Sequence, residues 1–147
     1  MLKGLSRLNQ IRRAKRGRAA REGDVQAFLR VARHSFVQLQ AAWDRADVPA
    51  MGLFVTEPLL AELREQLAAR GEAPNRTEVL ELHAKLLALE EMHEAFVASV
   101  EFSGLIREQL GQAAQPFREL WLLAKPKVAA PQAAEQGWQL ARVQSLS

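Results

Sequence analysis

The 147-residue chain contains no cysteine and only three histidines, and these shortages exclude several kinds of site. Without cysteine there is no disulfide framework, no thiolate nucleophile and no zinc–thiolate centre. His34, His83 and His93 have no metal-ligand spacing, because no two of them lie four residues apart as they would on one helix face. We therefore expect neither a metal nor another cofactor.

Long apolar runs are also missing. A membrane-spanning helix needs about 20 apolar residues, and a secretory signal needs an apolar stretch of about 7 to 15. We expect that the chain does not span a bilayer and is not exported by a signal of that kind. An Arg-rich start without acidic residues resembles a mitochondrial transit peptide, although it holds a single serine, Ser6. The compartment stays open at this stage.

Acidic residues are absent from the first twenty-one positions, which hold eight of the twenty Lys and Arg residues. The remainder has twelve basic against seventeen acidic residues, a formal charge of −5. With 48% hydrophobic and 25% charged residues, the composition is ordinary for one soluble domain. We therefore predict two parts, a basic arm (residues 1–21) and a mildly acidic body (residues 22–147).

The first half of the basic arm has apolar residues at every third position, which predicts a basic amphipathic helix. Such a helix can lie in a lipid interface, and its cations also suit the phosphates of RNA. A disordered, solvated tail is the simpler alternative. The expected membrane-inserting residues are Leu2, Leu5, Leu8 and Ile11. The expected anion-binding residues are Lys3, Arg7, Arg12, Arg13, Lys15, Arg16, Arg18 and Arg21.

Two helices are predicted at the start of the body. Apolar residues recur by threes and fours from Asp24, a plausible N-cap, to Trp43. The Asp47–Pro49 segment breaks this helix and leads into a short apolar turn over 51–55. Thr56 then precedes a leucine-rich helix that ends before Gly71.

Four strands are predicted after the helices, over 80–88, 96–103, 117–125 and 138–146, from alternating apolar and polar residues. The first is rich in leucine, so a helix is an alternative there. Gly104 suggests a bulge or a bend of the kind that a curved sheet needs. Two helices followed by four strands predict an α+β fold in which helices cover one face of an antiparallel sheet.

Several sequence blocks of the body resemble one known family. They are FLRVARHSFVQLQAAWD, LAELREQLAARG, VASVEFSGLIRE, PFRELWLLAKP and GWQLARVQ, and they run from about Val25 to Gln144. Their order and spacing resemble the Tim44-like domain, which is found in the import-motor adaptor of the mitochondrial inner membrane and in bacterial proteins.

The resemblance implies a cystatin-like or nuclear transport factor two-like fold, in which a strongly curved four-stranded sheet wraps against helices and leaves an apolar pocket. It also implies a role without catalysis. Members attach peripherally to membranes rich in anionic lipid, act as adaptors for translocation machinery, or tether mitochondrial ribosomes. Bacterial members commonly carry a signal or membrane-spanning stretch ahead of the domain, whereas here only the basic arm precedes it. The chain is therefore either a short member or a fragment, and surface attachment is favoured over integral anchoring.

Aromatic residues are expected to form the core and the pocket wall, because they are not interleaved with basic residues as in a base-stacking platform. The expected lining residues are Phe36, Trp43, Phe102, Phe117, Trp121 and Trp138. A pocket of this kind could accept an acyl chain or another apolar ligand, and plain core packing is the alternative.

Related folds also host enzymes, so we looked for a general base. Glu119 is the best candidate, because strand alternation places it on the same side as Phe117 and Trp121, where apolar walls raise the pKa of a carboxyl group. Alternatively, Glu119 meets solvent near the sheet edge or pairs with Arg142. A lone carboxylate without a positioned partner is weak evidence for an active site, so we expect no catalytic residue and no enzyme.

The separated charges, the leucine stripe of the arm and the family resemblance together imply a non-enzymatic adaptor, peripheral on the inner membrane. The face would be the cytoplasmic one in a bacterium or the matrix one in a mitochondrion. The expected partners are anionic phospholipid and a protein. The alternatives are a tether for RNA or ribosomes and, less favoured, an enzyme that uses the pocket.

Overall fold

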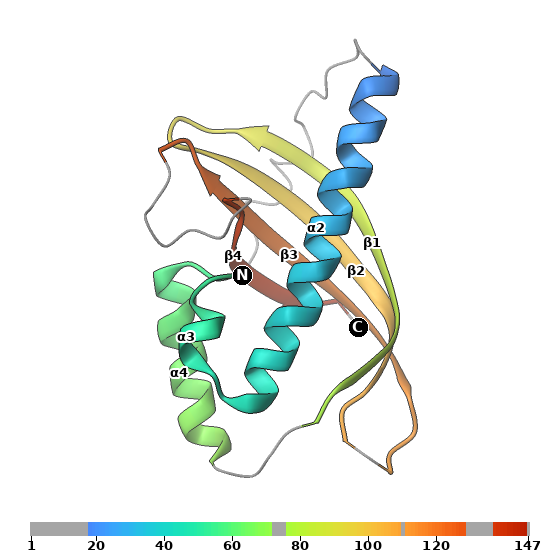
Figure 1. Cartoon of the computed structure of the whole chain (residues 1–147), viewed down its shortest axis with the longest axis vertical. Coiled ribbons are helices and arrows are strands. Elements are labelled where there is room, and N and C mark those ends of the chain that lie inside the picture. Colours follow the sequence, from blue (N-terminus) through green and yellow to red (C-terminus); the bar gives the residue numbers. More distant parts are fainter. Residues whose placement is uncertain (1–17, 72–75, 110, 129–136, 147) are drawn as a thin grey trace.

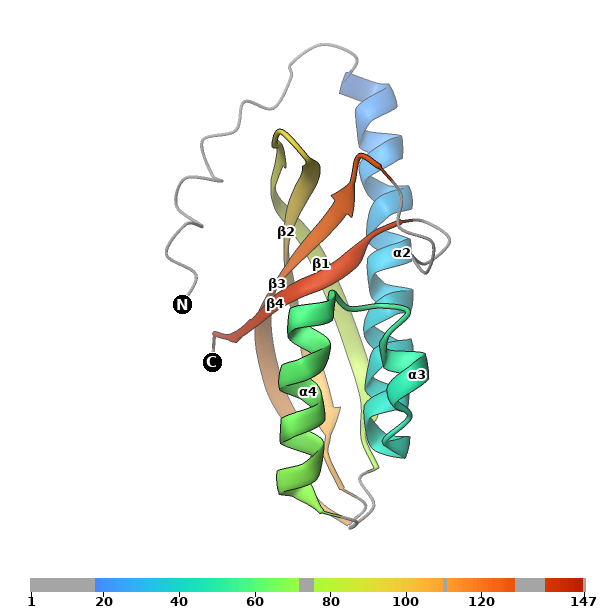
Figure 2. The ribbon, with the colours of Figure 1, turned by 90° about the vertical axis from the view of Figure 1, so that its left-hand side faces the viewer.

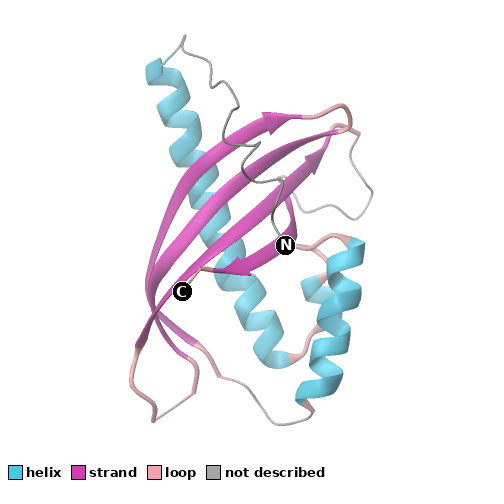
Figure 3. Cartoon of the chain, turned by 180° about the vertical axis from the view of Figure 1, so that it is seen from behind, coloured by secondary structure: helices cyan, strands magenta, loops and turns pink. Residues whose placement is uncertain are grey.

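A computed structural model of the chain describes residues 18–71, 76–109, 111–128 and 137–146. In this part, helices precede an antiparallel sheet with strand order β1-β2-β3-β4. The helices lie on one face of the sheet, and Figure 3 shows the opposite face (Figures 1 and 3). The predicted α+β fold is therefore confirmed. The elements are α2 (Arg18–Arg45), α3 (Val48–Met51), α4 (Glu57–Arg70), β1 (Glu78–Glu91), β2 (Ala95–Arg107), β3 (Gln115–Pro126) and β4 (Gln139–Ser145).

Helix α2 begins six residues earlier than predicted, at Arg18. Asp24 lies inside the helix, so the prediction that it is the N-cap was wrong. Ala19 and Ala20 have high helix propensity and extend the helix towards the N-terminus. The apolar stripe was predicted correctly, since it is buried against the sheet. The first turns of α2 project past the end of the sheet in two perpendicular views (Figures 1 and 2).

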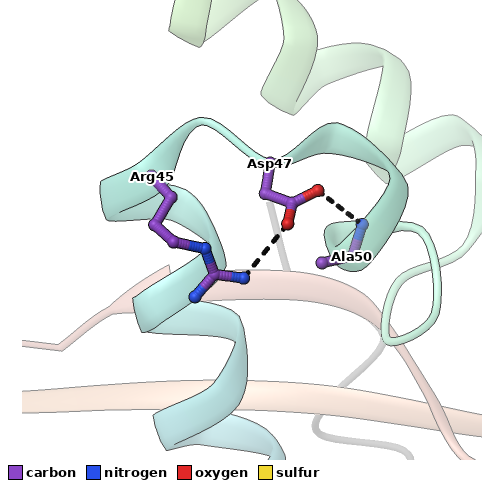
Figure 4. A network of polar contacts seen from close by, with 3 residues as sticks. All are labelled: Arg45, Asp47 and Ala50. Atoms are coloured by element: carbon purple, nitrogen blue, oxygen red, sulfur yellow. Dashed lines mark hydrogen bonds and ion pairs between the residues drawn. The ribbon is translucent and has the colours of Figure 1, made fainter.

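A short helix, α3, occupies part of the segment that was expected to be a break followed by a turn. Asp47 is its N-cap, and its carboxylate accepts hydrogen bonds from the Ala50 amide at 3.2 Å and from Arg45 Nη2 at 3.1 Å (Figure 4). Pro49 suits the first turn, where its missing amide hydrogen costs no helical bond. The hydrogen bond from the Ala50 amide, and to a smaller extent the one from Arg45, hold the pKa of Asp47 below its usual value.

Bulges in the two edge strands change which residues face the helices. Opposite β2, β1 has extra residues at Leu80 and Leu87, and β4 has an extra residue at Ala141 opposite β3. Leu80, the first residue of the first predicted strand, is the extra residue of one bulge and is 44% exposed. Of the bulge or bend predicted at Gly104, the bulge is wrong, because Gly104 pairs in register with residues on both neighbouring strands. Bulges bend a strand and increase its twist, which helps β1 and β4 to curve.

The core fills the space between α2 and the inner face of the sheet, which we define as the face towards the helices. Phe36 of α2 is 1% exposed, and its ring centroid lies 4.8 Å from that of Phe102, 5.1 Å from that of Trp121 and 5.6 Å from that of Phe117. These side chains come from α2, β2 and β3. Aromatic packing therefore joins the long helix to the two central strands.

Candidate functional site

A pocket of about 710 Å³ lies between the helices and the C-terminal half of the sheet. The lining residues come from one face of α4, from β4 and part of β3, and from α2 and α3. It is lined by Leu39, Gln40, Trp43, Met51, Pro58, Leu59, Glu62, Leu63, Gln66, Glu119, Trp121, Leu140, Ala141, Arg142, Val143, Gln144 and Ser145.

The chain before α4 pairs with β4 and so sets the position of this helix. Val55 forms a parallel bridge with Leu140. The Thr56 amide donates to the Leu140 carbonyl at 2.9 Å, and the Leu140 amide donates to the Phe54 carbonyl at 2.7 Å. Thr56 is the N-cap by position, as predicted, but among the described residues its side chain makes no capping bond. Gly71 ends the helix as predicted, with a φ of +81° that suits glycine.

The far end of α4 is attached to α2 through Arg70. Its Nη1 donates to the Trp43 carbonyl at 2.8 Å, and its guanidinium lies 5.3 Å from the centroid of the Trp43 ring. Next to Trp43, the Asp44 carboxylate accepts hydrogen bonds from the Thr77 amide at 2.6 Å and from the Thr77 hydroxyl at 3.0 Å. These contacts join α4 to α2 and α2 to the start of β1, so both ends of the pocket wall are anchored.

The pocket has an apolar floor and a polar rim. The floor is formed by buried side chains, with Met51, Leu140 and Trp121 between 0% and 3% exposed. Exposed Glu62 and Ser145 lie at the rim. The remaining floor residues are Leu39 and Leu59, and the other exposed lining residues of α4 are Pro58 and Gln66. This combination suits a ligand with an apolar body.

Glu119 is the half-buried carboxyl group of the pocket. Trp121 Nε1 donates to its Oε1 at 2.9 Å. Burial raises the pKa of Glu119 above its usual value; the indole hydrogen bond partly offsets this, and the negative charge of Glu108 adds to it. The prediction that Glu119 and Trp121 share the inner face was correct. Ser145 lies opposite Glu119, whereas Arg142 lies opposite Leu122 on the outer face.

The residues predicted to line a pocket separate into two groups. Trp43 and Trp121 line it. Phe36, Phe102 and Phe117 pack together in the core, and Trp138 packs edge-on against Phe28 at 5.0 Å between ring centroids. Sequence reasoning missed the polar residues of α4 and the residues of β4. The spacing of Glu62 and Gln66 with Leu59 and Leu63 places all four on one helix face, which was the available signal.

The basic arm lies largely outside the described residues. This applies to the predicted lipid-inserting residues Leu2, Leu5, Leu8 and Ile11 and to the cations Lys3, Arg7, Arg12, Arg13, Lys15 and Arg16. Arg18 and Arg21 belong to the first turn of α2. Helix α2 is therefore continuous across residue 21, and the cationic sequence leads directly into it.

The three histidines do not meet in the structure. His34 is exposed on α2. His83 is exposed on β1, and its Nε2 lies 3.5 Å from Glu81 Oε1. His93 is exposed in the turn between β1 and β2. Within the described ranges, no group of three acidic or histidine side chains could hold a metal ion. No helix in those ranges is both long and apolar enough to cross a membrane.

Comparisons with known proteins identify the family. The model of the Tim44-like domain matches residues 13–145. A ketosteroid isomerase-like protein from Erwinia carotovora atroseptica SCRI1043 is similar in structure, at 14% identity and a TM-score of 0.44, over 78% of this chain and 93% of that chain. No curated protein matches the chain. Because the family model spans nearly the whole sequence, the chain belongs to the Tim44-like domain family.

Proposed function

We propose that this chain is a non-enzymatic adaptor domain that docks on an anionic phospholipid surface through its basic arm and binds a protein partner through its body. Its place would be the inner membrane, on the cytoplasmic face in a bacterium or the matrix face in a mitochondrion. The separation of charge is the observation that carries the proposal, with eight cations and no acid in residues 1–21 and a charge of −5 on the rest.

Family membership supports the inner-membrane location and the non-enzymatic role in this proposal. The Tim44-like family is associated with the inner membrane and with protein transport, and it is generally non-enzymatic. Lipid docking and the protein partner go beyond the family and belong to this proposal.

The direction of α2 supports an oriented attachment. The cationic sequence leads into the end of α2 that projects past the sheet (Figures 1 and 2). An anionic surface attracts the basic arm and repels the acidic body, and this repulsion fades beyond a Debye length of about 8 Å at physiological salt. We therefore expect the body to be held away from the lipid, where a protein can reach it.

Electrostatics also give the expected strength. Each Lys or Arg near an anionic surface contributes about 1 kcal/mol, so replacing four of them should weaken partitioning by about 10³-fold. The test is flotation with liposomes of phosphatidylcholine alone or with increasing cardiolipin. The arm variant replaces Arg12, Arg13, Lys15 and Arg16 by Gln. The matched control replaces four exposed cations of the body, Arg30, Arg64, Arg76 and Lys85, by Gln.

The proposal predicts that the natural chain and the body control float with cardiolipin liposomes, and that the arm variant and a chain beginning at Glu22 do not. Equal flotation of the two four-site variants would show that total charge acts rather than the basic arm. If the natural chain ignores anionic liposomes but binds RNA with a steep salt dependence, the RNA or ribosome tether replaces the membrane reading.

A further inference from the structure

The pocket beside α4 contains apolar surface that the fold itself does not cover. Val143 lines it and is 43% exposed, although it lies on the inner face opposite Trp121. Leu63 and Trp43 also line it and are half-buried. A volume of about 710 Å³ is in the range of small-molecule sites. A ligand with an apolar body would cover this surface.

The charge inside the pocket indicates the head group of such a ligand. Among the residues that the structure describes, Glu119 accepts one hydrogen bond, from the Trp121 indole to Oε1. An ionised carboxylate has about four acceptor positions, so a ligand placed in the pocket can donate further bonds to it. A half-buried carboxylate is poorly solvated, and a cationic donor restores the lost interaction more fully than a neutral one.

The other charged lining residues favour a cation as well. Glu62 adds a second carboxylate at the rim. Arg142 is the cationic lining residue, and its register opposite Leu122 turns its side chain to the outer face of the sheet. An anionic head group would therefore meet the carboxylates of Glu119 inside the pocket and Glu62 at its rim.

We infer that this pocket is a binding site for an organic amine, whose apolar body lies against Trp121, Leu63 and Val143 and whose ammonium group donates hydrogen bonds to Glu119. This site is separate from the basic arm and does not depend on the proposed membrane docking. It also gives Glu119 a binding role that requires no catalysis.

The test compares three probes with the same alkyl chain, decylamine, decanol and decanoate, each kept below its micelle concentration. Binding to the full chain is followed by tryptophan fluorescence, because Trp43 and Trp121 line the pocket. We expect decylamine to bind at least about tenfold more tightly than decanol, since its ammonium adds charge–charge attraction to the hydrogen bond that either head group donates to the carboxylate. Decanoate should bind most weakly.

Two variants separate the head-group contact from the apolar contact. Glu119→Gln keeps the size and an acceptor for the Trp121 indole, so the fold should be retained while decylamine falls to the affinity of decanol. Glu65→Gln is the matched control, because Glu65 is an exposed carboxylate of α4 that does not line the pocket, and it should leave decylamine binding unchanged. Leu63→Trp fills the pocket and should abolish binding of both decylamine and decanol, with unchanged circular dichroism.

The pH dependence gives an independent measurement. Decylamine needs the ionised carboxylate, so its binding should weaken as the pH falls through the pKa of Glu119, which burial raises. Binding to Glu119→Gln should not change over the same range. The inference is overturned if no probe binds, if decylamine and decanol bind equally, if Glu119→Gln retains the preference for the amine, or if binding survives Leu63→Trp.

Discussion

Replacing Gly104 by alanine should destabilise the sheet strongly, because the backbones of β1 and β2 approach each other closely there. A Cβ atom on Gly104 would lie 1.9 Å from the Glu81 carbonyl oxygen and 2.6 Å from its carbon, whereas ordinary contact begins at 3.4 Å. The obstacle is backbone, which no side-chain rotation can remove. Gly104 also has a φ of +153°, a backbone angle that residues with a Cβ atom rarely adopt.

The cost follows from these two terms. Backbone strain at such a φ costs about 1–3 kcal/mol, and separating the strands weakens neighbouring ladder hydrogen bonds worth about 1 kcal/mol each. We expect Gly104→Ala to lower the free energy of unfolding by about 3–5 kcal/mol. With a urea dependence of about 1.5 kcal/mol/M, the midpoint should fall by about 2–3 M.

The matched control is the same substitution at Gly23, inside α2, where an added Cβ meets nothing within 4 Å. Alanine is the better helix former, so Gly23→Ala should stabilise the chain by about 0.5–1 kcal/mol. Urea unfolding followed by tryptophan fluorescence measures both changes. Gly104→Ala with the midpoint of the natural chain would refute the close approach of β1 and β2.

Three further predictions concern the core and two carboxylates. Phe36→Ala should cost about 3–5 kcal/mol of unfolding free energy in urea, because a buried ring with three aromatic neighbours is lost. Asp47→Ala should lower the melting temperature at pH 7, because the ionised carboxylate stabilises the fold. The difference between the two chains should vanish as the pH falls through the lowered folded-state pKa of Asp47. Glu119→Gln should raise the melting temperature at neutral pH, because a raised folded-state pKa means that ionised Glu119 destabilises the fold. This gain in melting temperature should disappear below the unfolded-state pKa of Glu119.

The controls follow from exposure and hydrogen bonding. Val37 is 42% exposed on the same helix, so Val37→Ala should change stability by less than about 0.5 kcal/mol. Asp47→Asn keeps an acceptor for the Ala50 amide without the charge, and should cost less than Asp47→Ala. The prediction for Asp47 is wrong if Asp47→Ala still has the lower melting temperature at low pH. The prediction for Glu119 is wrong if Glu119→Gln has a lower melting temperature than the natural chain at neutral pH.

Local signals predicted α4 and the four strands well. Thr56 and Gly71 stand at the two ends of α4, where the helix begins and stops in the structure. Alternation located each strand, because side chains point to opposite faces at every step. The start of α2 was harder to predict, because Asp24 fits the N-cap preference while Ala19 and Ala20 continue the helix past it.

The bulges and the pocket could not be predicted from local patterns. A bulge is an extra residue in one strand relative to its partner strand. Leu80 is exposed because it is the extra residue where β1 pairs with β2. The role of Gly104 depends likewise on the partner strand. The pocket depends on the pairing of Val55 with Leu140, which joins distant parts of the chain and sets α4 beside β4.

The sequence by itself determined the separation of charge, the α+β order of elements and the face on which Glu119 and Trp121 lie, because these depend on composition and on short-range periodicity. Only the tertiary structure decided that Phe36 belongs to the core while Trp43 lines a pocket, and that burial raises the pKa of Glu119. The physical reason is that periodicity specifies which side of an element is apolar, whereas long-range packing determines whether that side meets other side chains or an open space.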